Sequence, residues 1–167
     1  MRKISVLLVI IAMALTLAGC GGESSDASDS AGGTDDALVF TYDGTEIALD
    51  ADAEGIISAL GEPKNYTEEP SCAFEGLDKT YYYGGFYMTT YPSDNGDRVY
   101  SIWFADDSVQ TADGIKIGDS QEKVEECYGA DSASGESAYT LTSGEGRLTV
   151  IVEDGAVSSV SYELIVD

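Results

Sequence analysis

Histidine is absent from this 167-residue chain, and basic residues are scarce: 8 lysines and arginines stand against 31 aspartates and glutamates. The lack of histidine removes the commonest general base and the commonest metal ligand in proteins. The shortage of positive charge leaves a formal net charge of -23, which repels the phosphates of nucleic acid. We therefore expect no nucleic-acid partner, no metal or other cofactor, and no catalysis.

The chain has one long apolar stretch near its start, and this stretch is too short to span a membrane. It runs from Ile4 to Leu17, which is 14 residues, whereas a membrane-spanning helix needs about 20. It follows Arg2 and Lys3 and leads into small residues. A short basic start, an apolar centre and a small-residue end are typical of a secretory signal peptide. We therefore expect an exported protein.

The segment Leu17-Ala18-Gly19-Cys20 resembles the lipobox of bacterial lipoproteins. The resemblance implies that residues 1–19 are removed as a signal peptide and that the Cys20 sulfur carries a diacylglycerol group. Two acyl chains anchor firmly, since each buried methylene contributes about 0.8 kcal/mol. The alternative is a plain signal peptide followed by a chance cysteine. The resemblance thus predicts a lipid-anchored protein on the extracytoplasmic face of the cell membrane.

Residues 20–37 hold no large apolar side chain and are rich in glycine, serine and aspartate. Such a composition cannot bury enough surface to offset chain entropy, so we expect a disordered acidic linker. This kind of linker favours a Gram-positive lipoprotein. Removing residues 1–19 leaves 6 basic residues against 31 acidic ones. The globular part is then predicted to be residues 38–167.

Residues 38–167 alternate short apolar strands with two short helical segments. Helices are expected at 53–60, after the capping residue Asp52, and again after Ser120. Aligning Ile47 with Ile115 brings the two helical segments into register. Pairs of Asp-Gly and Gly-Gly between the strands indicate hairpins. Strands are expected at 38–42, 45–49, 79–83, 86–91, 98–104, 138–142, 147–153 and 156–164.

This self-similarity predicts an α+β fold made of two tandem repeats, residues 38–106 and 107–167, packed as one domain. Each repeat is expected to be a helix followed by a three-strand antiparallel meander. Neither repeat alone is large enough for an independent core. We therefore expect the two helices to cover one face of the strands.

The motif Ile115-x-Ile-Gly-Asp-Ser, continued by Tyr128-Gly129 and by Gly155-x-Val-x-x-Val-x-Tyr162, carries a second resemblance. It resembles the tandem-repeat fold of the β-lactamase-inhibitor protein family, which a small lipoprotein of the outer-membrane β-barrel assembly machine shares. The whole chain also resembles small lipoproteins of Gram-positive anaerobes. These resemblances imply a non-catalytic binding role.

The aromatic residues of the first half are the best candidates for a binding surface. Strand alternation sends neighbouring side chains to opposite faces, so the rings cannot all enter the core. If Ile102 and Phe104 face the helices, Trp103 faces away, and at least one of the tyrosines at 81–83 joins it. Exposed tyrosine and tryptophan are favoured at protein interfaces. The predicted binding residues are Trp103, Tyr81, Tyr83, Tyr87 and Tyr100.

Three functions are compatible with this pattern, and a structural alternative accompanies them. The first is a scaffold or binding module that holds an envelope protein. The second uses the same rings to bind a cell-wall glycan or a small ligand, and the third, more remote, is a hydrolase with paired carboxylates. The structural alternative is that the rings pack against an expected loop at 64–78 or against the second half of the chain.

Two further patterns concern Cys72, Cys127 and the acidic segment from Asp50 to Gly55. The two cysteines could form a disulfide in an exported protein, or remain buried as free thiols. The segment resembles the opening of a calcium-binding loop, but its position 12 is Gly61 rather than glutamate. We therefore interpret the segment as helix capping, by Asp50 or by Asp52.

Overall fold

The computed structural model describes residues 38–135 and 137–166 of the chain. The predicted signal peptide, residues 1–19, the lipidated Cys20 and the linker at 20–37 lie outside the described residues. None of the helices within the described ranges is long and apolar enough to cross a membrane.

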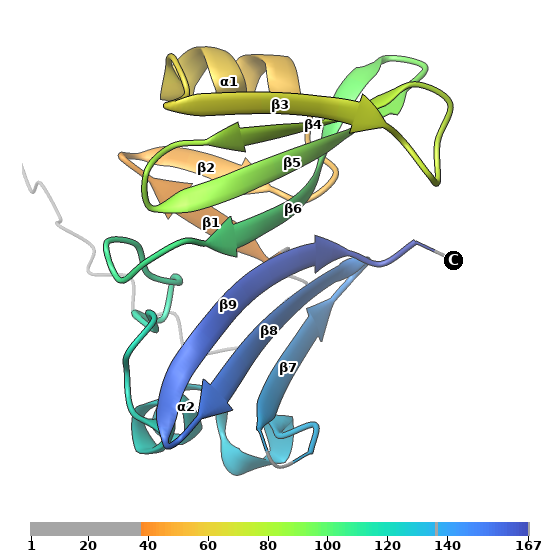
Figure 1. The fold of residues 1–167 in the computed structure, drawn as a ribbon. Coiled ribbons are helices and arrows are strands. Elements are labelled where there is room, and N and C mark those ends of the chain that lie inside the picture. The colour runs from red at the N-terminus through yellow and green to blue at the C-terminus, as the bar shows by residue number, and fades with distance from the viewer. Residues whose placement is uncertain (1–37, 136, 167) are drawn as a thin grey trace, which may run out of the picture. The chain divides into compact units, whose positions relative to one another are not determined.

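Seven antiparallel strands form the main sheet, in the order β3-β4-β5-β6-β9-β8-β7 (Figure 1). Their pairing follows the chain except at the centre, where β6 lies beside β9. That central pairing is short: only the stretch from Ser101 to Trp103 is in register with β9. The strands are β3 (Asn65–Pro70), β4 (Leu77–Tyr82), β5 (Phe86–Ser93), β6 (Gly96–Phe104), β7 (Ala138–Ser143), β8 (Gly146–Glu153) and β9 (Ala156–Leu164).

A separate two-stranded sheet precedes the main one. Strands β1 (Val39–Tyr42) and β2 (Thr45–Ala48) form the expected hairpin. Its turn residues Asp43 and Gly44 have φ of 47° and 79°, the left-handed pair that a type I′ turn requires. The hairpin supplies Phe40 and Ile47, both fully buried, to the core of the main sheet.

Two short helices, α1 (Ala53–Leu60) and α2 (Gln121–Tyr128), precede the two groups of strands, and a 3₁₀ turn, η1 (Ala130–Ser132), follows α2. Asp52 caps α1, because its side chain accepts a hydrogen bond from the Gly55 amide at 3.4 Å. The cap interpretation of Asp52 is therefore confirmed. Ser120 caps α2 in the same way through the Lys123 amide.

The predicted fold class, α+β with two tandem helix-plus-meander repeats, is wrong. The described fold is mostly β, and its two helices are only eight residues long. Residues 65–70, expected within a loop, form β3, so four strands follow α1 whereas three follow α2. Tyr66 and Thr67 favour the extended state, and pairing with β4 satisfies the backbone groups of this segment. One continuous sheet, rather than two repeats with a helix layer, is the result.

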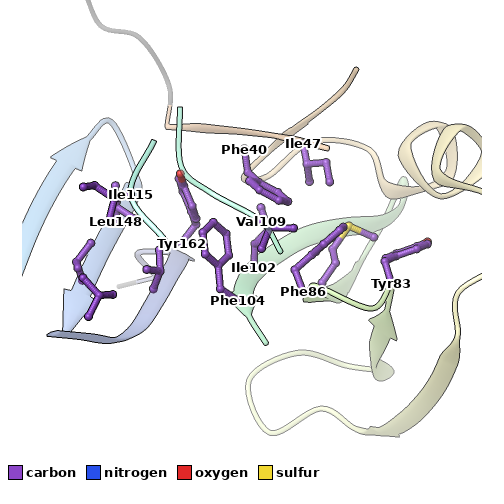
Figure 2. Close-up of a cluster of buried hydrophobic side chains, with 14 of the residues drawn as sticks. Phe40, Ile47, Tyr83, Phe86, Ile102, Phe104, Val109, Ile115, Leu148 and Tyr162 are labelled. Carbon is purple, nitrogen blue, oxygen red and sulfur yellow. The ribbon is translucent and has the colours of Figure 1, made fainter. Parts of the chain in front are cut away.

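The core lies on one face of the main sheet, under the β1–β2 hairpin (Figure 2). The Phe40 ring is 5.0 Å from the ring of Phe86 and 5.2 Å from that of Phe104, measured between centroids. It also lies 6.1 Å from the ring of Tyr162 in β9. These contacts join β1, β5, β6 and β9, so the hairpin links both groups of strands through a single aromatic cluster.

A β-bulge in β6 changes which residues face the core. Thr89 of β5 pairs with Ser101, but Thr90 pairs with Val99, which leaves Tyr100 without a partner in the register. Val99 and Ile102 are consequently both buried although they are three residues apart. The bulge turns Tyr100 and Ser101 together toward the opposite, open face of the sheet.

Candidate functional site

Trp103 and Tyr87 project from the open face of the main sheet. They are cross-strand partners on β6 and β5, and 54% of Trp103 and 43% of Tyr87 are exposed. The prediction that Trp103 faces away from the core is therefore confirmed. Tyr82 of β4 stacks on Tyr87, with ring centroids 4.6 Å apart and planes inclined by 26°. Three large rings thus stand in a row across three neighbouring strands.

Beside this row the open face is hollowed into a groove of about 360 Å³, called here the aromatic groove. It lies over β4, β5 and β6 and reaches across the short β6–β9 junction to Glu163, its one lining residue from β9. The bulge at Tyr100 increases the local twist of the strands, which helps to make a sheet surface concave. The lining residues are Asp78, Thr80, Tyr87, Thr89, Thr90, Tyr100, Ser101, Trp103 and Glu163.

The polar groups of the groove fall into two kinds. Hydroxyls form part of the lining, and those of Thr89 and Ser101 hydrogen-bond to each other. The carboxylates belong to Asp78 of β4 and Glu163 of β9. Asp78 Oδ1 is buried and has no hydrogen-bond partner in the part of the chain that the structure describes. The groove therefore combines aromatic surface with a carboxylate oxygen that lacks a hydrogen-bond donor.

Tyr81 and Tyr83, two of the predicted binding residues, do not reach this face. Both are buried, with 9% and 6% exposed, and burial raises the pKa of each phenol. Tyr81 shares its face with its cross-strand partner Met88, and Tyr83 stacks on Phe86. Tyr82 is the residue of this run that joins Trp103, because alternation along β4 gives it the opposite direction. All three residues of the run are tyrosines, so only the pairing of Tyr82 with Tyr87 distinguishes it from Tyr81 and Tyr83.

Tyr100 lies at one end of the groove, where a loop covers part of the open face. Its ring makes an edge-to-face contact with Tyr91, 6.2 Å between centroids. Tyr91 in turn stacks on Phe74, at 4.5 Å. The packing of rings against residues of the expected 64–78 loop is therefore real: it involves Tyr91, and Tyr66 also packs on Tyr81, at 5.1 Å. None of the ring contacts found among the described residues joins this segment to Trp103 or Tyr87.

The remaining candidate residues form no site in the described part of the chain. Cys72 and Cys127 are both free and exposed, so they are neither a disulfide nor buried thiols. Within residues 38–135 and 137–166, no group of three or more acidic or cysteine side chains is placed to hold a metal ion. Asp50 is engaged by Arg98, whose Nε donates to Asp50 Oδ1 at 2.6 Å.

No protein-family model matches the chain, and no curated protein matches it. Among solved structures, the chain is similar to an extracellular protein containing an SCP domain from Bacillus anthracis str. Ames. The TM-score is 0.43 at 14% sequence identity, and the match covers 74% of this chain and 47% of that one. The match therefore spans about half of that protein's length, and a likeness this distant assigns neither fold nor function to this chain.

Proposed function

We propose that this chain is a lipid-anchored extracytoplasmic binding module, in which the aromatic groove and the rings beside it hold an envelope protein. The observation that carries the proposal is the exposed pair Trp103 and Tyr87 at the rim of a ready-made hollow. Large rings left in water forgo the gain of burial, about 25 cal/mol for each Å² of apolar surface. A partner that covers them recovers that gain.

The groups at the groove suit binding. Rings of tyrosine and tryptophan give a large, rigid contact area, and they are enriched among the residues that dominate binding energy. The hydroxyls below them offer hydrogen bonds that fix orientation. Because the rings stand on paired strands rather than on a loop, their positions are set before a partner arrives, which lowers the entropy lost on association.

The predicted anchor fits this role. A lipid on Cys20, joined to the domain by the linker predicted from the sequence, would hold the groove near the membrane surface. A flexible chain of that length has a root-mean-square span of about 20–25 Å. Tethering of this kind raises the effective concentration of the module at envelope partners.

The test uses residues 21–167, which contain all of the described residues, 38–135 and 137–166. The immobilised protein is exposed to solubilised envelope from the source cell, beside the variants Trp103→Ala and Tyr87→Ala. We expect a discrete protein to be retained by the parent and lost from both variants. Chemical cross-linking followed by mass spectrometry then places the retained protein on β5 or β6.

Tyr66→Ala is the matched control. Tyr66 is 43% exposed, as Tyr87 is, but it pairs in register with the buried Tyr81 and so belongs to the other face of the sheet. Equal loss in all three variants would contradict a role for the groove. Release of the bound material by soluble cell-wall glycan would instead favour the glycan-binding alternative, in which the same rings stack on sugars.

A further inference from the structure

We infer that the aromatic groove receives the side chain of a lysine or arginine presented by the partner protein. This inference rests on the function proposed above and adds the chemistry that the partner must bring. It is carried by three features of the same hollow: the pairing of its rings with negative charge, the unsatisfied oxygen of Asp78, and its size and setting.

The first feature is the pairing of rings with negative charge. The faces of Trp103 and Tyr87 carry negative potential, and a cation held over such a face within about 6 Å is attracted to it. Asp78 and Glu163 line the same groove, from β4 and β9. A positive group on an apolar stem would contact the rings with its stem and the carboxylates with its head.

The second feature is the unsatisfied oxygen of Asp78. Buried carboxylate oxygens are normally hydrogen-bonded, because leaving one unpaired costs much of its lost hydration. Asp78 Oδ1 has no partner within the described residues. An ammonium or guanidinium group donates strong, charge-assisted hydrogen bonds and would satisfy this oxygen.

The basic residues among those the structure describes do not occupy the groove, so a cation from another molecule can bind there. None of the described residues that line it is basic. Lys79, the neighbour of Asp78, is paired with Asp97 at 2.5 Å. Arg147 faces Glu163 across the β8–β9 register, but none of the ion pairs found among the described residues joins them. None of the ion pairs found among the described residues therefore involves Asp78.

The third feature is size and setting. A volume of about 360 Å³ is at the lower end for ligand pockets, so it suits one or two side chains rather than an oligosaccharide. Trp103 and Tyr87 line the groove and are also partly exposed, so they extend the contact area beyond it, which a macromolecule can cover and a small amine cannot. The net charge of -23 also steers a basic surface toward this chain.

The test exploits the fact that Trp103 is the sole tryptophan of the chain. Residues 21–167 are titrated with a capped peptide of one lysine between alanines, and the Trp103 indole N–H is followed by NMR. The same peptide with its lysine acetylated is the neutral counterpart, and an arginine peptide is the second probe. Butylammonium, a free amine of similar stem length, completes the set.

We expect the lysine and arginine peptides to shift the Trp103 resonance saturably, and the acetylated peptide to bind at least about fivefold more weakly. Asp78→Asn, which keeps the shape of the side chain, should weaken the lysine peptide by a similar factor. Asp107→Asn is the matched control, because it removes one exposed acidic charge outside the groove. It should leave binding unchanged.

The contrary outcomes separate this inference from the function on which it rests. If charged and acetylated peptides bind alike, or Asp107→Asn weakens binding as much as Asp78→Asn, specific recognition of a cation in the groove is wrong. Capture of an envelope protein that depends on Trp103 would still leave the proposed function standing. If butylammonium binds as tightly as the peptides, the groove is a small-amine site, and the assignment to a protein partner is overturned. If no probe binds, the inference fails.

Discussion

Trp103 and Phe104 are neighbours in β6, yet one is half exposed and the other is buried beneath the β1–β2 hairpin. The alternation of a strand produces this difference, and the bulge at Tyr100 determines where the alternation is shifted. Asp50 is held in an unusual conformation by its neighbours. It lies just after β2 and adopts a left-handed φ of 58°. Its carboxylate accepts from Arg98 and also from the Tyr91 hydroxyl at 2.5 Å.

We predict that Asp50→Asn lowers the free energy of unfolding of residues 21–167 at pH 7 by about 1 kcal/mol. The effect is no larger because the Asp50–Arg98 pair is partly exposed to water. Asparagine tolerates the left-handed backbone, so the change tests the charge. The hydrogen bond from Arg98 holds the pKa of Asp50 below its ordinary value. A lowered pKa stabilises the fold above the unfolded-state pKa, near 3.9, and this contribution is lost as pH falls through the lower folded-state value.

The measurement is urea unfolding of parent and variant between pH 7 and pH 2. The difference between the two should shrink as the pH falls below about 4. A difference that stays constant over that range would show that the lost hydrogen-bond geometry, and not the carboxylate charge, accounts for the effect.

Among the elements, the connection after β6 is held against the turn between β4 and β5. The Ala105 amide donates to the carbonyl of Gly85 at 2.8 Å, and Val109 of the same connection is buried. A Cβ on Gly85 would come within 2.4 Å of Ser108 Oγ and 2.7 Å of Val109 Cγ1. This turn therefore has no room for a side chain, although its backbone is not left-handed.

We predict opposite effects for the same substitution at two glycines. Gly85→Ala should destabilise the fold by about 1–3 kcal/mol, because the connection must move away from the turn. Gly55→Ala should stabilise it by about 0.5–1 kcal/mol, because Gly55 lies inside α1 with open space around it. Thermal or urea unfolding of both variants checks this. Equal destabilisation would mean that α1 also contacts something at Gly55.

For the whole molecule, acidic charge is the dominant feature, and three of the six described lysines and arginines form ion pairs. Lys79, Arg98 and Lys123 each pair with an aspartate. The described fold is held by its aromatic core, with no cross-link between Cys72 and Cys127. Two consequences can be measured on the intact chain.

The first concerns the thiols. Because Cys72 and Cys127 are free and exposed, both should react with an alkylating reagent in the native protein, without denaturant. The melting temperature of residues 21–167 should be the same with and without reductant. Mass spectrometry gives the number of alkyl groups added. A product that lacks them until it is reduced would contradict the free state.

The second concerns the proposed anchor. In the source cell, Cys20→Ala should move the full-length chain from the membrane fraction to the soluble extracytoplasmic fraction, because the lipid supplies the attachment. The parent should carry the mass of a diacylglycerol group on its N-terminal cysteine. Membrane association that persists in the variant would show attachment through another part of the chain.

The sequence by itself determined the local features: the Asp43-Gly44 hairpin, the Asp52 cap, the second helix after Ser120, and the outward direction of Trp103. Each depends on a few adjacent residues, whose backbone preferences and alternation are readable without the fold. The composition also excluded histidine chemistry, and the resemblance of residues 17–20 to a lipobox predicts export and lipid attachment, which the Cys20→Ala variant tests.

Only the tertiary structure decided what depends on pairing between distant segments. Strand β3 forms because β4 has a free edge with which it can pair. With this additional strand, the described fold is one seven-stranded sheet and not the predicted two repeats. The register between β4 and β5 selected Tyr82 rather than Tyr81 or Tyr83 for the open face. Asp78 and Glu163, 85 positions apart in the chain, reach one groove because β6 lies beside β9. Such neighbours are set by long-range hydrogen bonding between strands, which leaves little trace in local sequence.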